Sequence, residues 1–280
     1  ASTEMHSSSE SLGAMAEETA SHGVTVVDDP ASVPFAPDVI HLNHVELAEA
    51  TFTVFPDTPA IFHCHMPGIP VPNAIRHPQI RACFGVSPLA CQQIESALGK
   101  PADGILGNFV DERLYQPRGP LPEVPARWLV ICEKKHGLRH LGLIVPIALR
   151  RGARLRAVGP RVKRRIANIP AEAARHDLVF ASARCAIEAA AAGAAVVLTD
   201  YRGVGGFLAP ENADYLLERN FGVEAFQEKA TAGAILRAVE AYDAHKAGKA
   251  AVYIRENAGL EKGLLKLEAI YRSVASDVGI

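Results

Sequence analysis

The sequence predicts an α/β protein with two domains, each built around a parallel sheet. Short apolar runs of strand length alternate with helical patterns along most of the chain, as is typical of parallel strands joined by helices. The 280 residues are long for one domain and sufficient for two domains that each bury a core. Gln116–Pro125 holds four prolines in ten residues and predicts a stiff connector. We therefore expect an N-terminal domain over residues 1–118 and a C-terminal domain over residues 119–280.

The first half of the chain contains apolar runs that we expect to be strands, separated by proline-rich turns. After a strand end at Ala1–Met5, these runs are Val24–Val27, Val39–Leu42, Ile61–His65, Ala82–Val86 and Ile105–Leu106. Helical patterns fall at Leu12–Thr19, Val45–Thr51 and Pro88–Leu98. The serines at positions 7–9 can cap the first of these helices.

The second half repeats the alternation. The expected strands are Trp128–Cys132, Leu155–Val158, Leu178–Ala181 and Ala195–Thr199, with a helix over Leu138–Leu149. Two further helical stripes follow, in Phe226–Tyr242 and in Leu264–Val274. The last of these helices can pack back on the first domain.

The stretch Asp177–Asn212 is the centre of the second half. A turn at Ser182–Ala183 and an alanine-rich helix separate its two strands, so two strand ends and one helix start point to the same edge of a sheet. Arg184 and Glu188 are one turn apart on that helix and project together. Arg202–Gly206 predicts a glycine-rich turn whose backbone amides can approach an anion. This edge is therefore the candidate ligand site.

The composition argues against several classes of protein. A net charge of −2 gives no electrostatic reason to expect nucleic acid as a partner. No window approaches about 18 uninterrupted apolar residues, and the first residues lack the pattern of a leader. The five cysteines form no C-x-x-C pair and favour buried thiols in a reducing compartment. We expect a cytoplasmic protein with a small-molecule partner, and peripheral attachment at the inner face of a membrane stays open.

Six short motifs, taken in order, resemble those of the GT-B glycosyltransferases, and within them the large retaining group called family four. They are Asp38–His41 (DVIH), Phe62–His65 (FHCH), Phe84–Ser87 (FGVS), Asn108–Asp111 (NFVD) with Tyr115–Pro117, Arg156–Gly159 (RAVG) and Glu188–Val197 (EAAAAGAAVV). The resemblance covers most of the chain.

This resemblance implies a GT-B fold of two Rossmann-like domains with a cleft between them, the second domain binding a nucleotide-diphosphate sugar. Glu188 would accept hydrogen bonds from the ribose, while cations and helix amides would stabilise the diphosphate without a metal or another cofactor. The acceptor, a saccharide or a lipid-linked molecule, would bind to the first domain. The donor-binding residues so implied are Glu188, Arg184, Lys135, Lys134, Gly203, Gly205 and Gly206.

The chain departs from the family pattern at several points. Ser8 and Ser9 replace the usual diglycine loop, and we assign them to the acceptor side. The second domain keeps a lysine but not the family's arginine after its first strand, and it keeps one of the two usual glutamates. The short spacing from strand to Glu188, with Arg184 between, is closer to the inverting GlcNAc transferases of peptidoglycan synthesis. Retention and inversion therefore both stay open.

His63 and His65 are two residues apart in a predicted strand and so face the same side. In the family a first-domain histidine approaches the donor sugar, which makes His65 or His63 the candidate catalytic residue. An inverting reaction needs a general base near the acceptor hydroxyl, and a histidine suits that role. Two ligands without a third are a poor signal for zinc, so no metal is expected.

The basic run Arg161–Arg165 has two readings. It is either a solvated helix face, which we favour, or a patch for anionic lipid or for a pyrophosphate-linked acceptor.

We therefore expect a glycosyltransferase that acts in polysaccharide or glycoconjugate synthesis. The alternatives are a catalytically silent paralogue that binds nucleotide sugars, and a nucleotide-sugar 2-epimerase.

Overall fold

The computed structural model describes residues 3–5, 14–44, 46–65, 73–113, 117–132, 136–164 and 168–276. Contacts divide the chain into two compact units. The first unit comprises Ala1–Leu106 with Leu267–Ile280, and the second comprises Gly107–Lys266. Parallel pairing dominates the sheets of both units, so the protein is α/β, as predicted.

The division between the units falls after Leu106, earlier than the proline-rich connector at which the sequence predicted it. The backbone N–H of Asn108 donates to Oδ1 of Asn220 at 3.1 Å, and Val110 forms a β-bridge with Gly259. These contacts fasten the segment before the prolines to the second unit.

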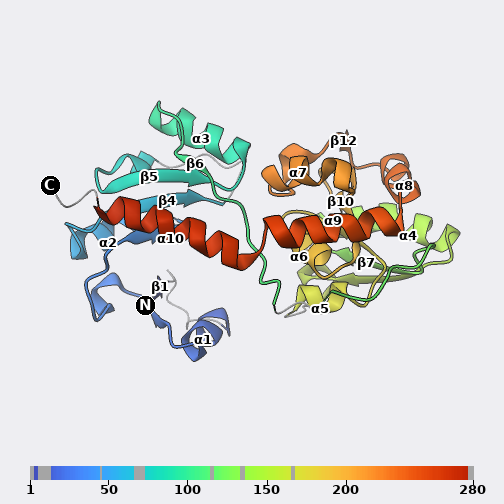
Figure 1. The fold of residues 1–280 in the computed structure, drawn as a ribbon, viewed down its shortest axis with the longest axis horizontal. Coiled ribbons are helices and arrows are strands. Elements are labelled where there is room, and N and C mark those ends of the chain that lie inside the picture. The colour runs from blue at the N-terminus through green and yellow to red at the C-terminus, as the bar shows by residue number, and fades with distance from the viewer. Residues whose placement is uncertain are drawn as a thin grey trace. The chain divides into compact units, whose positions relative to one another are not determined.

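In the first unit, strands β3, β4, β5 and β6 lie in that order and all run parallel, and β1 and β2 form a separate parallel pair (Figure 1). Its strands are β1 (Thr3–Met5), β2 (Thr25–Val27), β3 (Ile40–Leu42), β4 (Ala60–Cys64), β5 (Ile80–Gly85) and β6 (Gly104–Ile105). Its helices are α1 (Ala14–Ser21), α2 (Ala48–Val54) and α3 (Pro88–Leu98), with short 3-10 turns η1 (Pro30–Ser32) and η2 (Asn73–Arg76). The predicted strands agree with the observed ones to within a residue or two.

Local sequence signals set the ends of helix α3. The Ser87 hydroxyl accepts from the backbone N–H of Ala90, and Pro88 supplies the fixed φ that suits the first helical position. Gly99 ends the helix in the left-handed conformation, at φ 73°, which costs glycine little. All five residues of β4 are buried, as expected for a parallel strand covered on both faces.

In the second unit, six strands form one sheet in the order β12-β11-β10-β9-β7-β8. The strands β7 to β10 run parallel, and β11 and β12 are added antiparallel. The strands are β7 (Arg127–Ile131), β8 (Arg154–Val158), β9 (Leu178–Ala181), β10 (Ala195–Thr199), β11 (Gly203–Phe207) and β12 (Glu228–Lys229). The helices are α4 (Gly137–Arg150), α5 (Ile169–Ala173), α6 (Arg184–Ala191), α7 (Pro210–Glu218), α8 (Ala232–Glu240) and α9 (Ala244–Asn257), with 3-10 turns η3 (Pro160–Val162) and η4 (Val223–Ala225).

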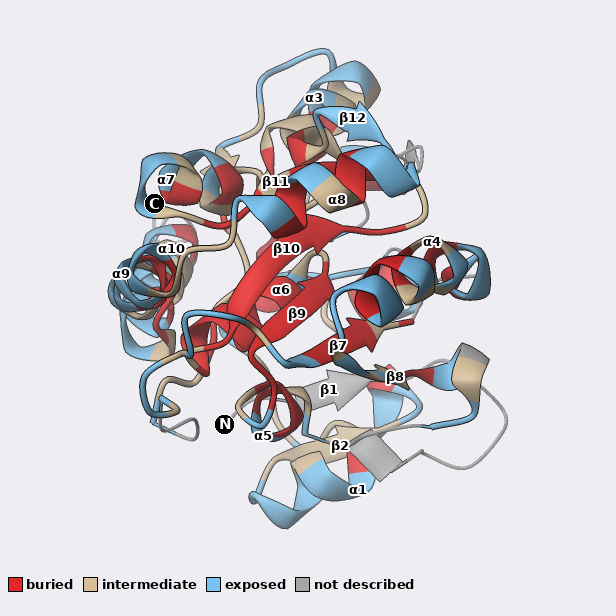
Figure 2. Cartoon of the chain, turned by 90° about the vertical axis from the view of Figure 1, so that its right-hand side faces the viewer, coloured by how far each residue is buried: buried red, intermediate tan, exposed pale blue. Residues whose placement is uncertain are grey.

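Helices cover both faces of this sheet (Figure 2). The buried residues of α4 and α8 share one hydrophobic cluster with one face of the strands, while those of α6, α7 and α9 share a second cluster with the other face. The central strands β9 and β10 are buried on both sides, which explains their uninterrupted apolar sequences. The helices that follow β7 and β9 therefore begin at the same edge of the sheet but on opposite faces.

Helix α10 (Leu260–Ser276) is shared by the two units, its residues up to Lys266 belonging to the second and those from Leu267 to the first. The Tyr271 hydroxyl lies 2.6 Å from Nδ1 of His41 on β3. The end of the last helix therefore packs on the first unit, as the sequence predicted. Among the helices of the described residues, none is both long and apolar enough to cross a membrane.

Two expectations for the second unit are wrong. The predicted glycine-rich turn is the start of strand β11, because residues 203–207 pair with β10 across a tight hairpin. The helix predicted over Phe226–Tyr242 begins only at Ala232, since Thr231 caps it through its side chain and Glu228–Lys229 forms a short strand. Helices α7 and α9 were not predicted as separate elements.

Candidate functional site

The carboxyl ends of β7 and β9 form the best candidate for a ligand site in the second unit. These strands are parallel neighbours, yet the chain leaves β7 toward β8 on one side and leaves β9 toward β10 on the other. Open α/β sheets bind their ligands at such a switch point. We call this place the switch-point edge.

Two helix N-termini meet this edge, α4 after β7 and α6 after β9. Neither N-cap residue, His136 for α4 or Ala183 for α6, caps its helix with a side chain. The first backbone N–H groups of each helix therefore keep their partial positive charge and hydrogen-bonding capacity. The sequence analysis identified the start of α6 and missed the contribution of α4.

The backbone before α6 is strained. Ala183 has φ 52° and ψ −141°, a combination that residues with a Cβ rarely adopt. Its N–H donates to the carbonyl of Phe221 at 2.7 Å, and Asn220 and Phe221 also have positive φ, 52° and 50°. Strain of this kind concentrates at ligand sites, where the surrounding structure holds it in place.

Arg184 and Glu188 form an ion pair on α6, as their spacing predicted, with Nε and Oε1 2.8 Å apart. Their environments differ, because the side chain of Arg184 is 67% exposed and that of Glu188 only 10%. The exposed guanidinium of Arg184 thus lies at the N-terminus of α6, and the largely buried carboxylate of Glu188 holds it from one turn further along the helix. The cation can reach an anion in solvent while Glu188 holds its orientation.

A second polar cluster follows β10. Arg202 donates to Asp200 from its backbone N–H at 2.7 Å and from Nη2 at 2.6 Å, and the Ser182 hydroxyl donates to Oδ2 of Asp200 at 3.3 Å. The guanidinium of Arg202 also lies 5.6 Å from the ring centre of Tyr201. From the sequence, Ser182 and Arg202 were expected only as turn residues, although polar side chains directly after a buried strand are a usable signal of a site.

His140, on the second turn of α4, is only 3% exposed. Neither ring nitrogen has a hydrogen-bond partner among the described residues. Burial lowers the pKa of His140 to about 4, against an opposing effect of the Asp200 carboxylate, so the ring is neutral at pH 7. The sequence contains no periodic signal that marks this histidine as polar and buried.

The remaining donor-site predictions divide into two groups. Lys134 and Lys135, and Ser8 and Ser9 on the acceptor side, lie outside the described residues. Gly203, Gly205 and Gly206 belong to strand β11 instead of a turn.

Close packing explains why positions 203 and 205 are glycine. A Cβ on Gly203 would lie 2.7 Å from Cβ of Phe226, and one on Gly205 would lie 2.5 Å from a methyl of Leu198. These glycines are therefore required by close packing, and the turn geometry proposed for binding phosphate is not present.

In the first unit, His63 and His65 lie side by side, with ring centres 3.9 Å apart. Nε2 of His63 lies 2.7 Å from the carbonyl of Leu106 and so donates to it, and burial lowers the pKa of His63 to about 3. His65 is exposed, and its Nε2 lies 2.9 Å from Oδ1 of Asn43. Of the two candidates, His65 is therefore the one whose ring is accessible from solvent, although desolvation and the nearby His44 lower its pKa to about 4.

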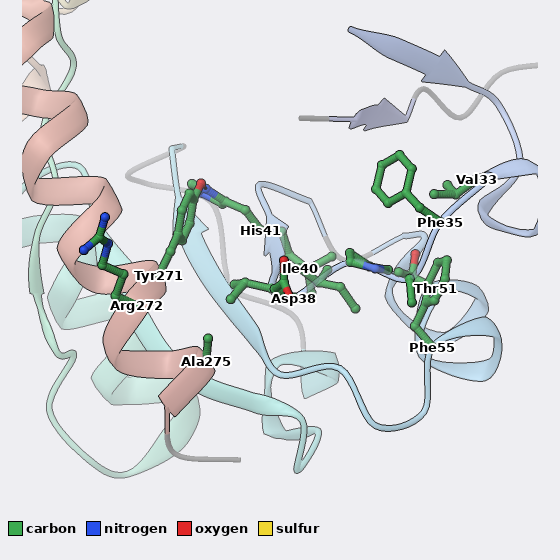
Figure 3. Close-up of a pocket in the computed structure, with 14 residues that line it drawn as sticks. Val33, Phe35, Asp38, Ile40, His41, Thr51, Phe55, Tyr271, Arg272 and Ala275 are labelled. Atoms are coloured by element: carbon green, nitrogen blue, oxygen red, sulfur yellow. Dashed lines mark hydrogen bonds between the residues drawn. The ribbon is translucent and has the colours of Figure 1, made fainter. Parts of the chain in front are cut away.

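His41 extends this histidine pair toward a cavity of about 760 Å³ (Figure 3). Its ring centre lies 5.6 Å from that of His63, and Nδ1 contacts the hydroxyl of Tyr271. The cavity is lined by residues of β3 and the segment before it, by Thr51 and Phe55 at the end of α2, and by α10. Its walls are mostly apolar, and Asp38 and Arg272 are the charged side chains that line it. Among the described residues, no group of three or more His, Cys, Asp or Glu side chains is arranged to hold a metal ion.

Comparison with known proteins adds no relative. No protein-family model matches the chain, and no curated protein matches it significantly.

Proposed function

We propose that this protein is a glycosyltransferase that moves a sugar from a nucleotide-diphosphate sugar to an acceptor hydroxyl. The observation that carries the proposal is the switch-point edge, where two uncapped helix N-termini, the exposed Arg184 and the buried Glu188 occur together. The resemblance of the sequence motifs to GT-B transferases supports the same conclusion.

A nucleotide-diphosphate sugar reacts when its glycosidic C–O bond breaks and the nucleoside diphosphate leaves with an additional negative charge. Backbone N–H groups at the starts of α4 and α6 favour that charge. Arg184 adds a full positive charge on an exposed side chain at the start of α6, from which it can pair with the phosphates. Glu188, one turn deeper, is suited to accept two hydrogen bonds from the ribose hydroxyls.

On the acceptor side, His65 is the proposed group that approaches the donor sugar. In an inverting reaction it would accept the proton of the acceptor hydroxyl as the new bond to the anomeric carbon forms and the diphosphate departs. In a retaining reaction no such base is required. The apolar cavity beside His41 offers space for an acceptor with an apolar part, such as a lipid-linked saccharide.

We place this transferase in the cytoplasm and in polysaccharide or glycoconjugate synthesis. A lipid-linked acceptor would require peripheral attachment to the inner face of a membrane.

A second candidate function is a catalytically silent protein that binds nucleotide sugars. It is favoured by the state of the two histidines. Nε2 of His63 is engaged by a carbonyl, and desolvation lowers the pKa of His63 to about 3 and that of His65 to about 4, so both are weak bases near neutral pH. In this alternative the switch-point edge binds the donor while no transfer follows.

A thermal-shift screen tests the shared part of both functions. UDP-, GDP- and ADP-sugars are added to the full chain, and binding to the folded state raises the melting temperature. We expect at least one of them to raise it, and expect Glu188→Ala to abolish the rise. Glu240→Ala, which removes an exposed carboxylate of α8, is the matched control and should leave the rise intact. If none of the nucleotide sugars shifts the wild-type chain, the proposal is overturned.

A turnover assay then separates the two functions. Radiolabelled sugar donor is incubated with the protein and a membrane extract as the source of acceptor. Transfer that depends on His65 supports the transferase, whereas binding without transfer or hydrolysis supports the silent protein.

A further inference from the structure

The solvent face of helix α4 is apolar to an unusual degree. Leu138, Gly142, Val145 and Leu149 follow one another at intervals of four, three and four residues and so form one stripe along the helix. Leu138 is 58% exposed and Leu149 is 73% exposed, although surface helices normally present polar side chains outward. The opposite side of α4 is buried in the core through residues such as Ile144. Figure 2 shows the exposed side of α4 turned away from the sheet.

Positive charge surrounds this stripe. The chain carries no Asp or Glu from His136 to Ala171, although its total net charge is −2. The basic residues of this acid-free stretch are Arg139, Arg150, Arg151, Arg154, Arg156, Arg161, Lys163, Arg164 and Arg165.

Five exposed members of this set, Arg139, Arg150, Arg154, Lys163 and Arg164, have no ion-pair partner among the described residues. Arg139 and Arg150 lie on α4 near its two ends, next to Leu138 and Leu149. Lys163 and Arg164 directly follow η3, and η3 packs against α4. The apolar stripe therefore has cations near both ends.

We propose that the solvent face of α4 docks on an anionic lipid surface. In this arrangement Leu138 and Leu149 enter the boundary between headgroups and acyl chains, while Arg139, Arg150, Lys163 and Arg164 contact anionic headgroups. A stripe of exposed leucines with unpaired cations near both ends matches both parts of such a membrane, the negative headgroups and the apolar interior; the exposed Glu240 of the neighbouring α8 is neutralised by Arg151.

The same charges disfavour a second copy of this chain as the partner that covers the solvent face of α4. A dimer that buried the stripe across a twofold axis would place the arginines of one α4 close to those of the other, without carboxylates from this stretch to pair with them. The anionic bilayer has no such conflict.

Docking through α4 has a consequence for the proposed transferase. Helix α4 begins at the switch-point edge, so a membrane bound along this helix would lie beside the donor site of the same unit. The inference deepens the proposed membrane attachment and rests on it, but binding to lipid does not depend on sugar transfer.

The test is co-sedimentation of the full chain with phosphatidylcholine vesicles, with and without phosphatidylglycerol. We expect binding to the anionic vesicles that weakens as salt rises. Replacing Arg139 and Arg150 by Gln should lower the partition coefficient by about fivefold for each charge removed. Leu138→Ser with Leu149→Ser should lower it by about tenfold per leucine.

Matched controls remove equal numbers of similar groups outside the surface. Lys249→Gln with Lys262→Gln takes two charges from α9 and α10, and Leu264→Ser with Leu265→Ser takes two exposed leucines from α10. These variants should bind as the wild type does. Melting temperature, measured with and without nucleotide sugar, identifies variants that fail to fold and reports donor binding separately from lipid binding.

Three outcomes would overturn the inference. They are equal or absent binding to the two kinds of vesicle, binding that the α4 variants do not weaken, and a dimer in solution that the leucine variants convert to monomers. If the chain binds anionic vesicles but no nucleotide sugar raises its melting temperature, the membrane-docking surface is supported and the donor site is rejected.

Discussion

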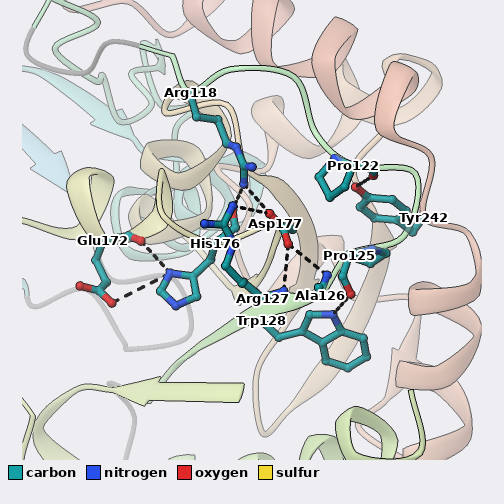
Figure 4. Close-up of polar contacts among 10 residues, drawn as sticks. All are labelled: Arg118, Pro122, Pro125, Ala126, Arg127, Trp128, Glu172, His176, Asp177 and Tyr242. Atoms are coloured by element: carbon teal, nitrogen blue, oxygen red, sulfur yellow. Dashed lines mark hydrogen bonds and ion pairs between the residues drawn. The ribbon is translucent and has the colours of Figure 1, made fainter. Parts of the chain in front are cut away.

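At the amino edge of the second unit's sheet, Asp177 is only 2% exposed and its carboxylate is fully engaged (Figure 4). Its Oδ1 accepts from Arg118 at 3.0 Å and from Arg127 at 2.9 Å, and its Oδ2 accepts from the backbone N–H groups of Ala126 and Arg127. At the switch-point edge, at the other end of the same strand, Arg184 is mostly exposed and Ala183 is strained.

The difference separates charges that hold the fold from charges that are available to a ligand. The bonds from Arg127 and Arg118 to Asp177 tie the start of β7 and the proline-rich segment before it to the start of β9. A carboxylate with four donors has no capacity left for a substrate. An exposed guanidinium beside uncapped helix ends has that capacity, and its geometry contributes little to stability.

Removing the Asp177 carboxylate should have the largest effect on stability. Asp177→Ala leaves Arg118, which is 11% exposed, without its buried partner, and we expect a loss of about 3–5 kcal/mol in the free energy of unfolding. Urea unfolding measures it. The matched control is Glu228→Ala, which breaks an exposed ion pair with Arg237 and should cost less than about 1 kcal/mol. Equal losses in the two variants would contradict the contrast between the edges.

Acid should weaken the switch-point edge before the amino edge. The folded pKa of His140 is about 4 and its unfolded value about 6.5, so the unfolded state binds more protons as pH falls through this window. The contribution of neutral His140 to the free energy of unfolding is full above pH 6.5 and is lost as the pH falls toward 4. The loss amounts to about 3 kcal/mol at most. For Asp177, burial favours a raised pKa, but the bonds from Arg127 and Arg118 outweigh it and the net pKa is lowered, so its contribution persists further into acid.

The measurement is the free energy of unfolding across pH 4 to 7 for the wild type and for His140→Phe. The variant should show a shallower dependence on pH. An unchanged slope would assign the acid sensitivity to other groups, among them His63 and His41, whose pKa values are also lowered by burial.

Ala183→Gly should stabilise the folded protein. Glycine tolerates the positive φ of this position, and relief of the strain is expected to add about 1 kcal/mol, partly offset by the greater freedom of the unfolded chain. Ala189→Gly, inside helix α6, is the control and should destabilise. Destabilisation by Ala183→Gly would show that the backbone there is not under strain.

Arg184→Ala should have the smallest effect on the free energy of unfolding and a large effect on the binding of the nucleotide sugar. Its pair with Glu188 has an exposed member, so the loss in unfolding free energy should be about 0.3–0.5 kcal/mol. The thermal shift produced by a nucleotide sugar should fall sharply, because the cation nearest the helix mouth is gone. A normal shift in this variant would remove Arg184 from the donor site.

Much of the second unit could be predicted because its signals are local. The strands Leu178–Ala181 and Ala195–Thr199 were predicted at their observed bounds, since an apolar run of that length between a turn and a helix has few alternatives. The ion pair of Arg184 and Glu188 followed from helical spacing alone. Glycine content, in contrast, misled the prediction at Gly203–Gly206, because glycine marks both turns and places of close packing.

The sequence by itself determined the α/β alternation, the central strands and the residues that share one face of α6, because each depends on neighbours within a few positions. Tertiary structure alone decided that α4 joins α6 at the switch-point edge, that His140 is buried near Asp200, and that Asp177 is held by arginines some fifty residues earlier in the chain. These facts depend on which strands pair, and strand pairing joins residues that no local pattern connects.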